Sequence, residues 1–253
     1  MNVNIEGEMD MNIKQKNVSK SFDKKLIIKD MTLDIESGDI VCLLGPSGSG
    51  KTTIIRLLIG AIAADSGEIF FDKVKMPNLK LLKKVGFMPQ NDALYDDLSG
   101  EDNLKFFAEL YGVGKKEQTK RIEEMLSLVD LLSDRKKFVK HYSGGMKKRL
   151  SLAITLLHEP DVLLLDEPTV GIDPVLRHKL WEQFKAIKKA GKTIIVSTHV
   201  MDEVTECDKA ALIYKGNLIQ YDTVEKLLKQ TKNGKVEELF LVAAKELEGG
   251  EAI

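Results

Sequence analysis

The glycine-rich segment at residues 45–52 constrains the fold of this chain more than any other feature. Its sequence, GPSGSGKT, fits the pattern G-x-x-x-x-G-K-[ST], in which glycines let the backbone wrap around phosphate groups and point N–H donors at them. The apolar run 40–44 leads into the segment, and the apolar stretch 53–59 follows it. This order predicts a buried strand, a phosphate-binding loop, and a helix whose positive N-terminal end attracts anions.

The residues of this loop have separate predicted roles. We expect Lys51 to reach the β- and γ-phosphates of a nucleotide, and the Thr52 hydroxyl to bind Mg²⁺. The alternative is a flexible glycine loop without a ligand, but the flanking strand and helix favour phosphate binding. The residues predicted to contact the nucleotide here are Gly45, Pro46, Ser47, Gly48, Ser49, Gly50, Lys51, Thr52 and Thr53.

Two acidic residues, Asp166 and Glu167, directly follow the apolar run 162–165. A buried parallel strand delivers its last side chains to the edge of the sheet where α/β proteins bind ligands. We therefore expect Asp166 to hold Mg²⁺ through water, and Glu167 to act as a general base toward an attacking water. An isolated Asp-Glu pair is more often a solvated turn, so the upstream phosphate loop is what favours the catalytic interpretation.

The pattern of apolar residues divides the chain into regions. Short strands are predicted within 11–45 and 65–90, and helical periodicity dominates 92–158. From Asp161 onward, buried strands alternate with helices, which favours a mainly parallel sheet covered on both faces. The expected organisation is a loose N-terminal tail at 1–11, one α/β domain at 12–222 with the helical segment 92–158 inserted, and a helical tail at 223–253.

Composition argues against several classes of protein. The chain has 38 basic and 39 acidic residues and a formal net charge of -1, which gives no support to a nucleic acid as the main partner. No apolar run approaches the roughly 20 residues that a membrane-spanning helix needs, and the polar N-terminus lacks the apolar core of a signal peptide. Cys42 and Cys207 have no CxxC spacing and are expected to be buried, reduced thiols.

Further motifs surround the two strong ones and resemble those of the ABC ATPase family. The sequence YSGGM at 142–146 is similar to the family's LSGGQ signature. Gln90 matches the glutamine of the Q-loop, Asp173 matches the D-loop, and His199 matches the switch histidine. Together with the phosphate loop and the acidic pair, these elements follow the family's order along nearly the whole α/β domain.

The resemblance implies an α/β fold of the ABC ATPase type. This fold has a P-loop NTPase core with a mainly parallel sheet, an antiparallel β subdomain and an inserted α-helical subdomain. The resemblance also implies a head-to-tail pair of cassettes, in which Ser143, Gly144 and Gly145 of one copy contact the γ-phosphate of ATP bound by the other. Glycines at the start of a helix fit this role, because a helix N-terminus attracts anions.

The resemblance further assigns roles to single residues. His199 is implied to contact the γ-phosphate and to orient the attacking water, Gln90 to contribute to the metal and nucleotide sites, and Phe22 to stack on adenine. The implied catalytic residues are Glu167, His199 and Lys51. The implied metal ligands are Thr52, Gln90 and Asp166.

Cofactors, partners and location are likewise implied by the resemblance. ATP and Mg²⁺ are the expected cofactors. The expected partners are a separate transmembrane permease subunit and a second cassette, which is either another copy or a different chain. We expect the protein in the cytoplasm, on the inner face of the cell membrane. The helical insertion and the Gln90 loop, with Tyr95 near its exposed end, are expected to contact the membrane partner.

Two departures from the family signature indicate a subtype. Tyr142 replaces the usual leucine and Met146 the usual glutamine, whereas the serine and both glycines remain. With the run MKKRLSLAITLLHEPDVLLLDEPTVGIDP, these departures resemble the ATPase subunits of type 2 ABC exporters, the group of the daunorubicin-type drug exporters. Importer cassettes, which tend to read LSGGQQQR, remain an alternative.

Other classes of function also remain open at this point. A soluble ABC-type ATPase that acts on ribosomes normally carries two cassettes, but this chain has a single phosphate loop. A DNA-repair member has long coiled coils between the loop and the signature, and no sustained heptads occur here. A plain P-loop kinase has no need of a signature segment. These comparisons favour a transporter cassette.

Overall fold

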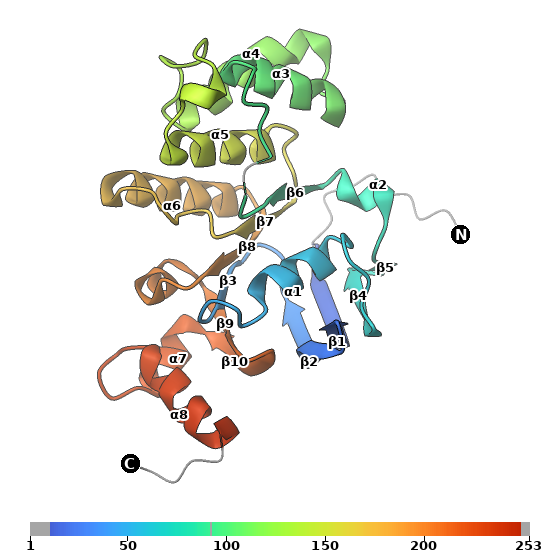
Figure 1. Cartoon of the computed structure of the whole chain (residues 1–253), viewed down its shortest axis with the longest axis vertical. Coiled ribbons are helices and arrows are strands. Elements are labelled where there is room, and N and C mark those ends of the chain that lie inside the picture. The colour runs from blue at the N-terminus through green and yellow to red at the C-terminus, as the bar shows by residue number, and fades with distance from the viewer. Residues whose placement is uncertain (1–10, 92, 249–253) are drawn as a thin grey trace.

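The computed structural model describes residues 11–91 and 93–248, and its central element is a mixed β-sheet (Figure 1). Among the described residues this sheet has six strands, in the order β10-β9-β3-β8-β7-β6. Only the β9–β10 pair is antiparallel within this described sheet. The strands are β3 (Ile40–Leu44), β6 (Val85–Met88), β7 (Val162–Asp166), β8 (Thr193–Thr198), β9 (Lys209–Tyr214) and β10 (Asn217–Thr223). The prediction of a mainly parallel sheet is therefore confirmed.

The two faces of this sheet have different covers because successive side chains of a strand point to opposite faces. Val41 and Leu43 of β3 pack against α1 (Lys51–Leu58) and a second sheet. Ile40 and Cys42 belong to the core on the opposite face, which the larger helices cover. The second sheet is antiparallel, with described strands in the order β2-β1-β4-β5. They are β1 (Ile13–Phe22), β2 (Lys25–Ile35), β4 (Ser66–Phe71) and β5 (Val74–Lys75).

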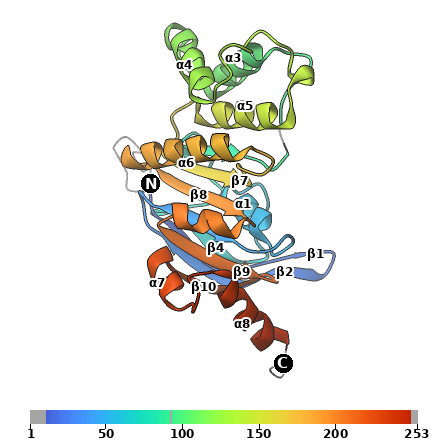
Figure 2. The same ribbon diagram turned by 90° about the vertical axis from the view of Figure 1, so that its left-hand side faces the viewer.

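Three helices, α3, α4 and α5, form a block at one end of the molecule, next to α6 (Figures 1 and 2). The chain enters this block after β6 and leaves it before β7. Ser99 starts α3, because its hydroxyl accepts a hydrogen bond from the Asp102 backbone N–H at 3.1 Å. The helices are α2 (Leu79–Leu82), α3 (Gly100–Tyr111), α4 (Lys115–Leu128), α5 (Gly144–Leu156), α6 (Pro174–Lys189), α7 (Val224–Lys229) and α8 (Glu237–Glu248), with short 3₁₀ helices η1 (Val139–His141) and η2 (Met201–Glu206).

The C-terminal helices pack against the main sheet. Leu227 of α7, Phe240 of α8 and the intervening Val236 join the same apolar core as Ala210 and other residues of β9. No helix within the described residues has the length and apolar character needed to cross a membrane.

The N-terminal boundary and the cysteines can be compared with their predictions. Residues 1–10 of the predicted loose tail lie outside the described residues, whereas Met11 is buried in the core beneath the antiparallel sheet. Cys42 and Cys207 are both buried and free, as predicted.

Candidate nucleotide site

The phosphate loop connects the C-terminal end of β3 to the N-terminus of α1, and glycines give it its shape. Gly48 and Gly50 have φ angles of 77° and 111°, which glycine adopts more readily than other residues. Gly45 is required for a different reason, since a Cβ atom there would lie 2.1 Å from the carbonyl oxygen of Ile213 in β9. The loop therefore lies closely on the sheet and leaves the first turn of α1 open to a ligand.

Lys51, the first residue of α1, is folded back over this loop. Its Nζ donates hydrogen bonds to the carbonyl oxygens of Gly45, at 2.7 Å, and Pro46, at 3.0 Å. Burial lowers the pKa of the Lys51 ammonium, and the nearby carboxylates of Glu167 and Asp166 oppose this effect. The loop thus contains a partly desolvated cation, whose attraction for phosphate oxygens is greater than that of a fully hydrated lysine.

The two predicted acidic residues lie at the C-terminal end of β7. Asp166 is 1% exposed, and its Oδ1 accepts a hydrogen bond from the hydroxyl of Ser197 in the neighbouring strand β8. Glu167 has a left-handed backbone with a φ angle of 52°, which turns the chain out of the strand. Its backbone N–H donates to the Ser197 hydroxyl at 3.0 Å. Ser197 therefore touches both acidic residues.

The Glu167 carboxylate is held between two residues that are distant in sequence. Gln90 Nε2 donates to Glu167 Oε2 at 2.9 Å, and His199 Nδ1 donates to Glu167 Oε1 at 2.9 Å. Because an ionised carboxylate only accepts, Nδ1 carries the proton in this contact. His199 Nε2 can then donate to a phosphate only when the imidazole is protonated. The sequence predicted a phosphate contact for His199, and the contact that the structure contains is with the candidate base.

A pocket of about 410 Å³ collects most of the predicted nucleotide-binding residues. It lies between the β1–β2 hairpin, the phosphate loop and the segments that follow β6 and β7. Two residues that were not predicted as site residues, Lys25 and Ile27, also line the pocket. The predicted site residues that line it are Phe22, Ser47, Gly48, Gly50, Lys51, Thr52, Thr53, Gln90 and Glu167. Gly45 and Ser49 are buried, whereas Pro46 is exposed on the loop. Asp166 and His199 do not line the pocket. Asp166 is linked to the lining residue Glu167 through Ser197, and His199 contacts Glu167 directly.

The signature residues are separated from this pocket. Ser143 caps the N-terminus of α5 by accepting a hydrogen bond from the Met146 N–H at 3.2 Å. Ser143 and Gly144 are exposed, Gly145 is partly exposed, and none of the three lines the pocket. Within one chain, the structure does not bring them to the phosphate loop.

Tyr142, the first departure from the family signature, is turned into the helical block. It is 7% exposed, and its hydroxyl donates to the carbonyl oxygen of Asp134 at 2.9 Å. Gly100 makes room for the ring, since a Cβ atom there would lie 2.3 Å from the Tyr142 hydroxyl oxygen. Tyr142 is therefore a core residue, and its aromatic ring leaves the exposed end of α5 unchanged.

The residues around the loop suit Mg²⁺, which prefers oxygen ligands in an octahedral arrangement completed by water and phosphate. Thr52 offers a hydroxyl and Gln90 an amide oxygen that is not used in its contact with Glu167. Ser197 occupies Oδ1 of Asp166, and no described residue donates to Oδ2. Within 11–91 and 93–248, no group of three or more His, Cys, Asp or Glu side chains that could hold a metal ion is found.

The sequence did not predict the pocket residues Lys25 and Ile27, or Ser197, which contacts both acidic residues. A serine at the end of an apolar strand has no local pattern of its own. The signal that could identify it is its position, because parallel strands present their C-terminal ends at one edge of the sheet and Ser197 pairs with Asp166 there.

The fold and the pocket define a P-loop α/β protein, in which the carboxylate residue Glu167 lines the same pocket as the phosphate loop. The family model described as "ABC transporter" matches residues 28–170, more than half of the chain. The chain belongs to this family and is an ATP-binding, ATP-hydrolysing cassette, as the motifs predicted.

Individual relatives agree with this assignment. The chain is 35% identical over 247 residues to the linearmycin resistance ATP-binding protein LnrL of Bacillus subtilis (strain 168), which covers 93% of the chain and 79% of LnrL. It is 36% identical over 207 residues to a Nod factor export ATP-binding protein I of Burkholderia lata, over 81% of the chain and 68% of that protein. It spans 39% of the probable multidrug ABC transporter ATP-binding protein YbhF of Escherichia coli, at 35% identity over 87% of the chain. The predicted similarity to exporter ATPases is thus confirmed.

Solved structures confirm the fold. An ATP-binding subunit of an ABC transporter superimposes with a TM-score of 0.83 at 26% identity, over 92% of this chain and 99% of the other. The ATP-binding cassette MJ0796, solved as a dimer in a post-hydrolysis state with ADP and Pi, gives a TM-score of 0.77 at 27% identity, over 83% of this chain and 98% of the other.

Proposed function

We propose that this cassette binds ATP with Mg²⁺ and hydrolyses it to drive export through a separate membrane subunit. The observation that carries the proposal is the pocket in which the phosphate loop, Gln90 and Glu167 meet. Glu167 is the general base, Lys51 and the loop N–H groups bind the phosphates, and Thr52, Gln90 and Asp166 hold the metal. The names of relatives in linearmycin resistance and Nod factor export support export as the direction of transport.

The reaction begins when the bound triphosphate and an attacking water approach Glu167. Each oxygen of the Glu167 carboxylate accepts one hydrogen bond, from Gln90 or from His199, and keeps a lone pair on which it accepts the proton of that water. His199, which contacts the same carboxylate, lies beside the attacking water in this proposal and orients it. When bound, Mg²⁺ supplies charge neutralisation of the phosphate oxygens, and the side chains Phe22 and Lys51 hold the two ends of the nucleotide.

A second cassette completes the site in this proposal. The N-terminus of α5, with Ser143 as its cap, is exposed, and a helix leaves the backbone N–H groups of its first turn without partners in the helix. A head-to-tail pair places this end of one copy against the γ-phosphate held by the other. The dimeric state of the similar cassette MJ0796 supports such a pair.

Mixing two disabled variants tests this arrangement. Ser143→Arg removes the signature contact of one copy, and Lys51→Ala removes the phosphate grip of the other. In a mixed dimer, one composite site then combines the intact phosphate loop of the first copy with the intact signature of the second. The other site combines the altered loop with the altered signature. We expect the mixed dimer to bind one ATP in a closed pair, and each variant alone to bind none in this state. Mixed dimers with two intact sites, or with none, contradict the trans arrangement.

The surface proposed for the membrane subunit is a row of aromatic rings, formed by Tyr95 and three residues of α3, with an adjoining groove. The rings of the row contact one another, with distances from 4.8 to 6.2 Å between ring centroids; they belong to Tyr95, Phe106, Phe107 and Tyr111. The centroid of the Tyr111 ring also lies 4.3 Å from that of His158. Tyr95, Phe106 and Tyr111 are exposed. Such a row of exposed aromatic rings is typical of an interaction surface.

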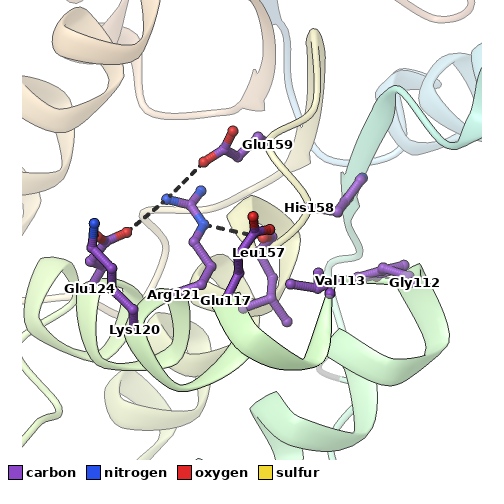
Figure 3. A pocket seen from close by; sticks show the side chains of 11 residues that line it. Gly112, Val113, Glu117, Lys120, Arg121, Glu124, Leu157, His158 and Glu159 are labelled. Atoms are coloured by element: carbon purple, nitrogen blue, oxygen red, sulfur yellow. Dashed lines mark hydrogen bonds and ion pairs between the residues drawn. The ribbon is translucent and has the colours of Figure 1, made fainter.

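The groove continues this row beyond Tyr111, and Figure 3 shows its lining. Arg121 lies at its base, where it donates to the carbonyl oxygens of Leu156 and Leu157 and pairs with Glu124 and Glu159 at 3.4 Å each. The carboxylate of Glu117 lies at the rim. We propose as occupant a helix end of the membrane subunit that has apolar residues toward the rings and a lysine or arginine toward Glu117.

Site-specific crosslinking tests this docking surface. A photoreactive residue at Tyr95 or Leu110 is expected to capture the membrane subunit, whereas the same residue at Lys226, at the opposite end of the molecule, is not. Glu117→Lys is expected to weaken the complex with the membrane subunit by reversing the charge at the rim. If crosslinks from α3 never reach a membrane protein, the docking surface lies elsewhere.

A further inference from the structure

Ser197 is the point at which the metal side and the base side of the site are joined. It is fully buried at the C-terminal end of β8 and pairs with Asp166 in the parallel ladder. Its hydroxyl donates to Asp166 Oδ1 and accepts the Glu167 backbone N–H at 3.0 Å. The Ser197 carbonyl oxygen lies 3.2 Å from the same N–H. One side chain thus uses both its donor and its acceptor capacity on two consecutive catalytic positions.

The contact with Asp166 decides how that carboxylate is presented. A carboxylate on a fully buried strand has two oxygens, and a free torsion would let either face the nucleotide. Because Ser197 occupies Oδ1 and no described residue donates to Oδ2, the Oδ2 atom is the one left for a metal-bound water. The contact with Glu167 acts on the backbone, where a residue other than glycine adopts a φ angle of 52°. Such backbone is retained only where surrounding contacts fix it.

We propose that Ser197 is a positioning residue that orients Asp166 toward Mg²⁺ and fixes the backbone turn that carries Glu167. This inference rests on the proposed function, because it assumes a metal–nucleotide complex in this pocket. Loss of an outer-shell partner typically weakens metal binding by about 10- to 100-fold, and Asp166, which binds through a metal-bound water, is itself such a partner. Ser197 acts one step further out, so we expect the lower end of that range, about tenfold, for loss of its hydroxyl.

The variants isolate the hydroxyl from its position in the core. Ser197→Ala removes it, Ser197→Cys keeps nearly the same size with a much weaker donor, and Ser197→Thr restores it. The control is Thr193→Val, at the other end of β8. Thr193 is also fully buried, and its hydroxyl accepts the Gly38 N–H at 2.9 Å. Its loss removes a comparable buried hydrogen bond from the same strand without touching the site.

The measurement uses Mn²⁺ in place of Mg²⁺, with a non-hydrolysable ATP analogue, followed by electron paramagnetic resonance on the full chain. Ser197→Ala is expected to bind Mn²⁺ about tenfold more weakly, with metal-free affinity for the analogue unchanged. Ser197→Cys should lose affinity in the same direction, and Ser197→Thr should recover it. Part of the ATPase rate lost in Ser197→Ala should recover when Mg²⁺ is raised, which a merely structural defect does not produce, and the part that stays lost reports the effect on the Glu167 turn.

The outcomes separate the inference from the proposed function. Wild-type Mn²⁺ affinity in both Ser197→Ala and Ser197→Cys overturns the positioning role, as does an equal loss in Thr193→Val. If Ser197→Ala does not fold, the Ser197→Cys and Ser197→Thr pair decides the question alone. If the wild-type chain binds no Mn²⁺ with the analogue, the proposed function fails first, and this inference fails with it.

Discussion

Replacement of the candidate base, Glu167→Gln, is expected to stop hydrolysis while ATP binding persists. The carboxylate accepts hydrogen bonds from Gln90 and His199 at 2.9 Å each. A glutamine has one acceptor oxygen, so its amide group faces one of these donors and loses that bond. A bond to a charged group contributes about 1.5–3 kcal/mol, which sets the upper limit of the loss in unfolding free energy. Phosphate binding by the loop does not depend on this side chain.

The effect on the rate is larger. A positioned general base contributes about 10²- to 10⁴-fold, or about 3–5.5 kcal/mol at about 1.4 kcal/mol for each factor of ten. Phosphate release at saturating ATP and Mg²⁺, with the membrane subunit supplied, should fall by this factor. Titration with a fluorescent ATP analogue should stay within about threefold of wild type, a change of less than about 1 kcal/mol, and light scattering should show a trapped dimer. Glu101→Gln, which replaces an acidic residue of the helical block, is the control. Normal turnover by Glu167→Gln would refute the assigned role.

Two further predictions concern packing and the nucleotide base. Gly100→Ala is expected to lower the unfolding free energy by about 1–3 kcal/mol, because its Cβ would lie 2.3 Å from the Tyr142 hydroxyl oxygen. In urea titrations the loss should be smaller in a Tyr142→Phe background, and equal losses in both backgrounds would contradict the steric explanation. Phe22→Ala is expected to weaken ATP binding by up to about tenfold through loss of ring stacking worth about 0.5–1.5 kcal/mol, measured by calorimetry, with Phe22→Tyr near wild type. An unchanged affinity for both variants would show that the 44% exposed ring does not contact adenine.

The parts of the fold and site that could be predicted from the sequence are those that short segments determine. The phosphate loop is predictable because its glycines, lysine and threonine are consecutive, and local backbone geometry decides their arrangement. The strand at Val162–Asp166 is predictable because its first four residues are apolar, as is typical of a buried parallel strand. The acidic residues at its end then follow from the general position of ligand sites in α/β sheets.

The remaining features depend on contacts between distant segments. Gln90 and Glu167 are 77 positions apart, and His199 and Glu167 are 32 apart, so their mutual contact has no local pattern. Tyr142 can point inward because Gly100 has no side chain at that place, and the sequence does not reveal that these two residues are in contact. The one-turn helix at Leu79–Leu82 lies in a region predicted as strands. The side chain of Asn78 starts this helix by accepting hydrogen bonds from the backbone N–H groups of Lys80 and Leu81, although the apolar pattern of the segment does not predict a helix.

The position of Gln90 has a mechanical consequence. It lies on the polypeptide that connects β6 to α3, so the segment that joins the catalytic sheet to the helical block also carries one of the two groups bonded to the base. A rotation of the block that displaces this connection by more than the tolerance of a hydrogen bond, a fraction of an ångström, would break the contact between Gln90 and Glu167 and so, in the proposed function, change how readily Glu167 accepts a proton. Subdomain orientation and the chemical competence of the base are therefore geometrically linked within a single chain, before any second copy is considered.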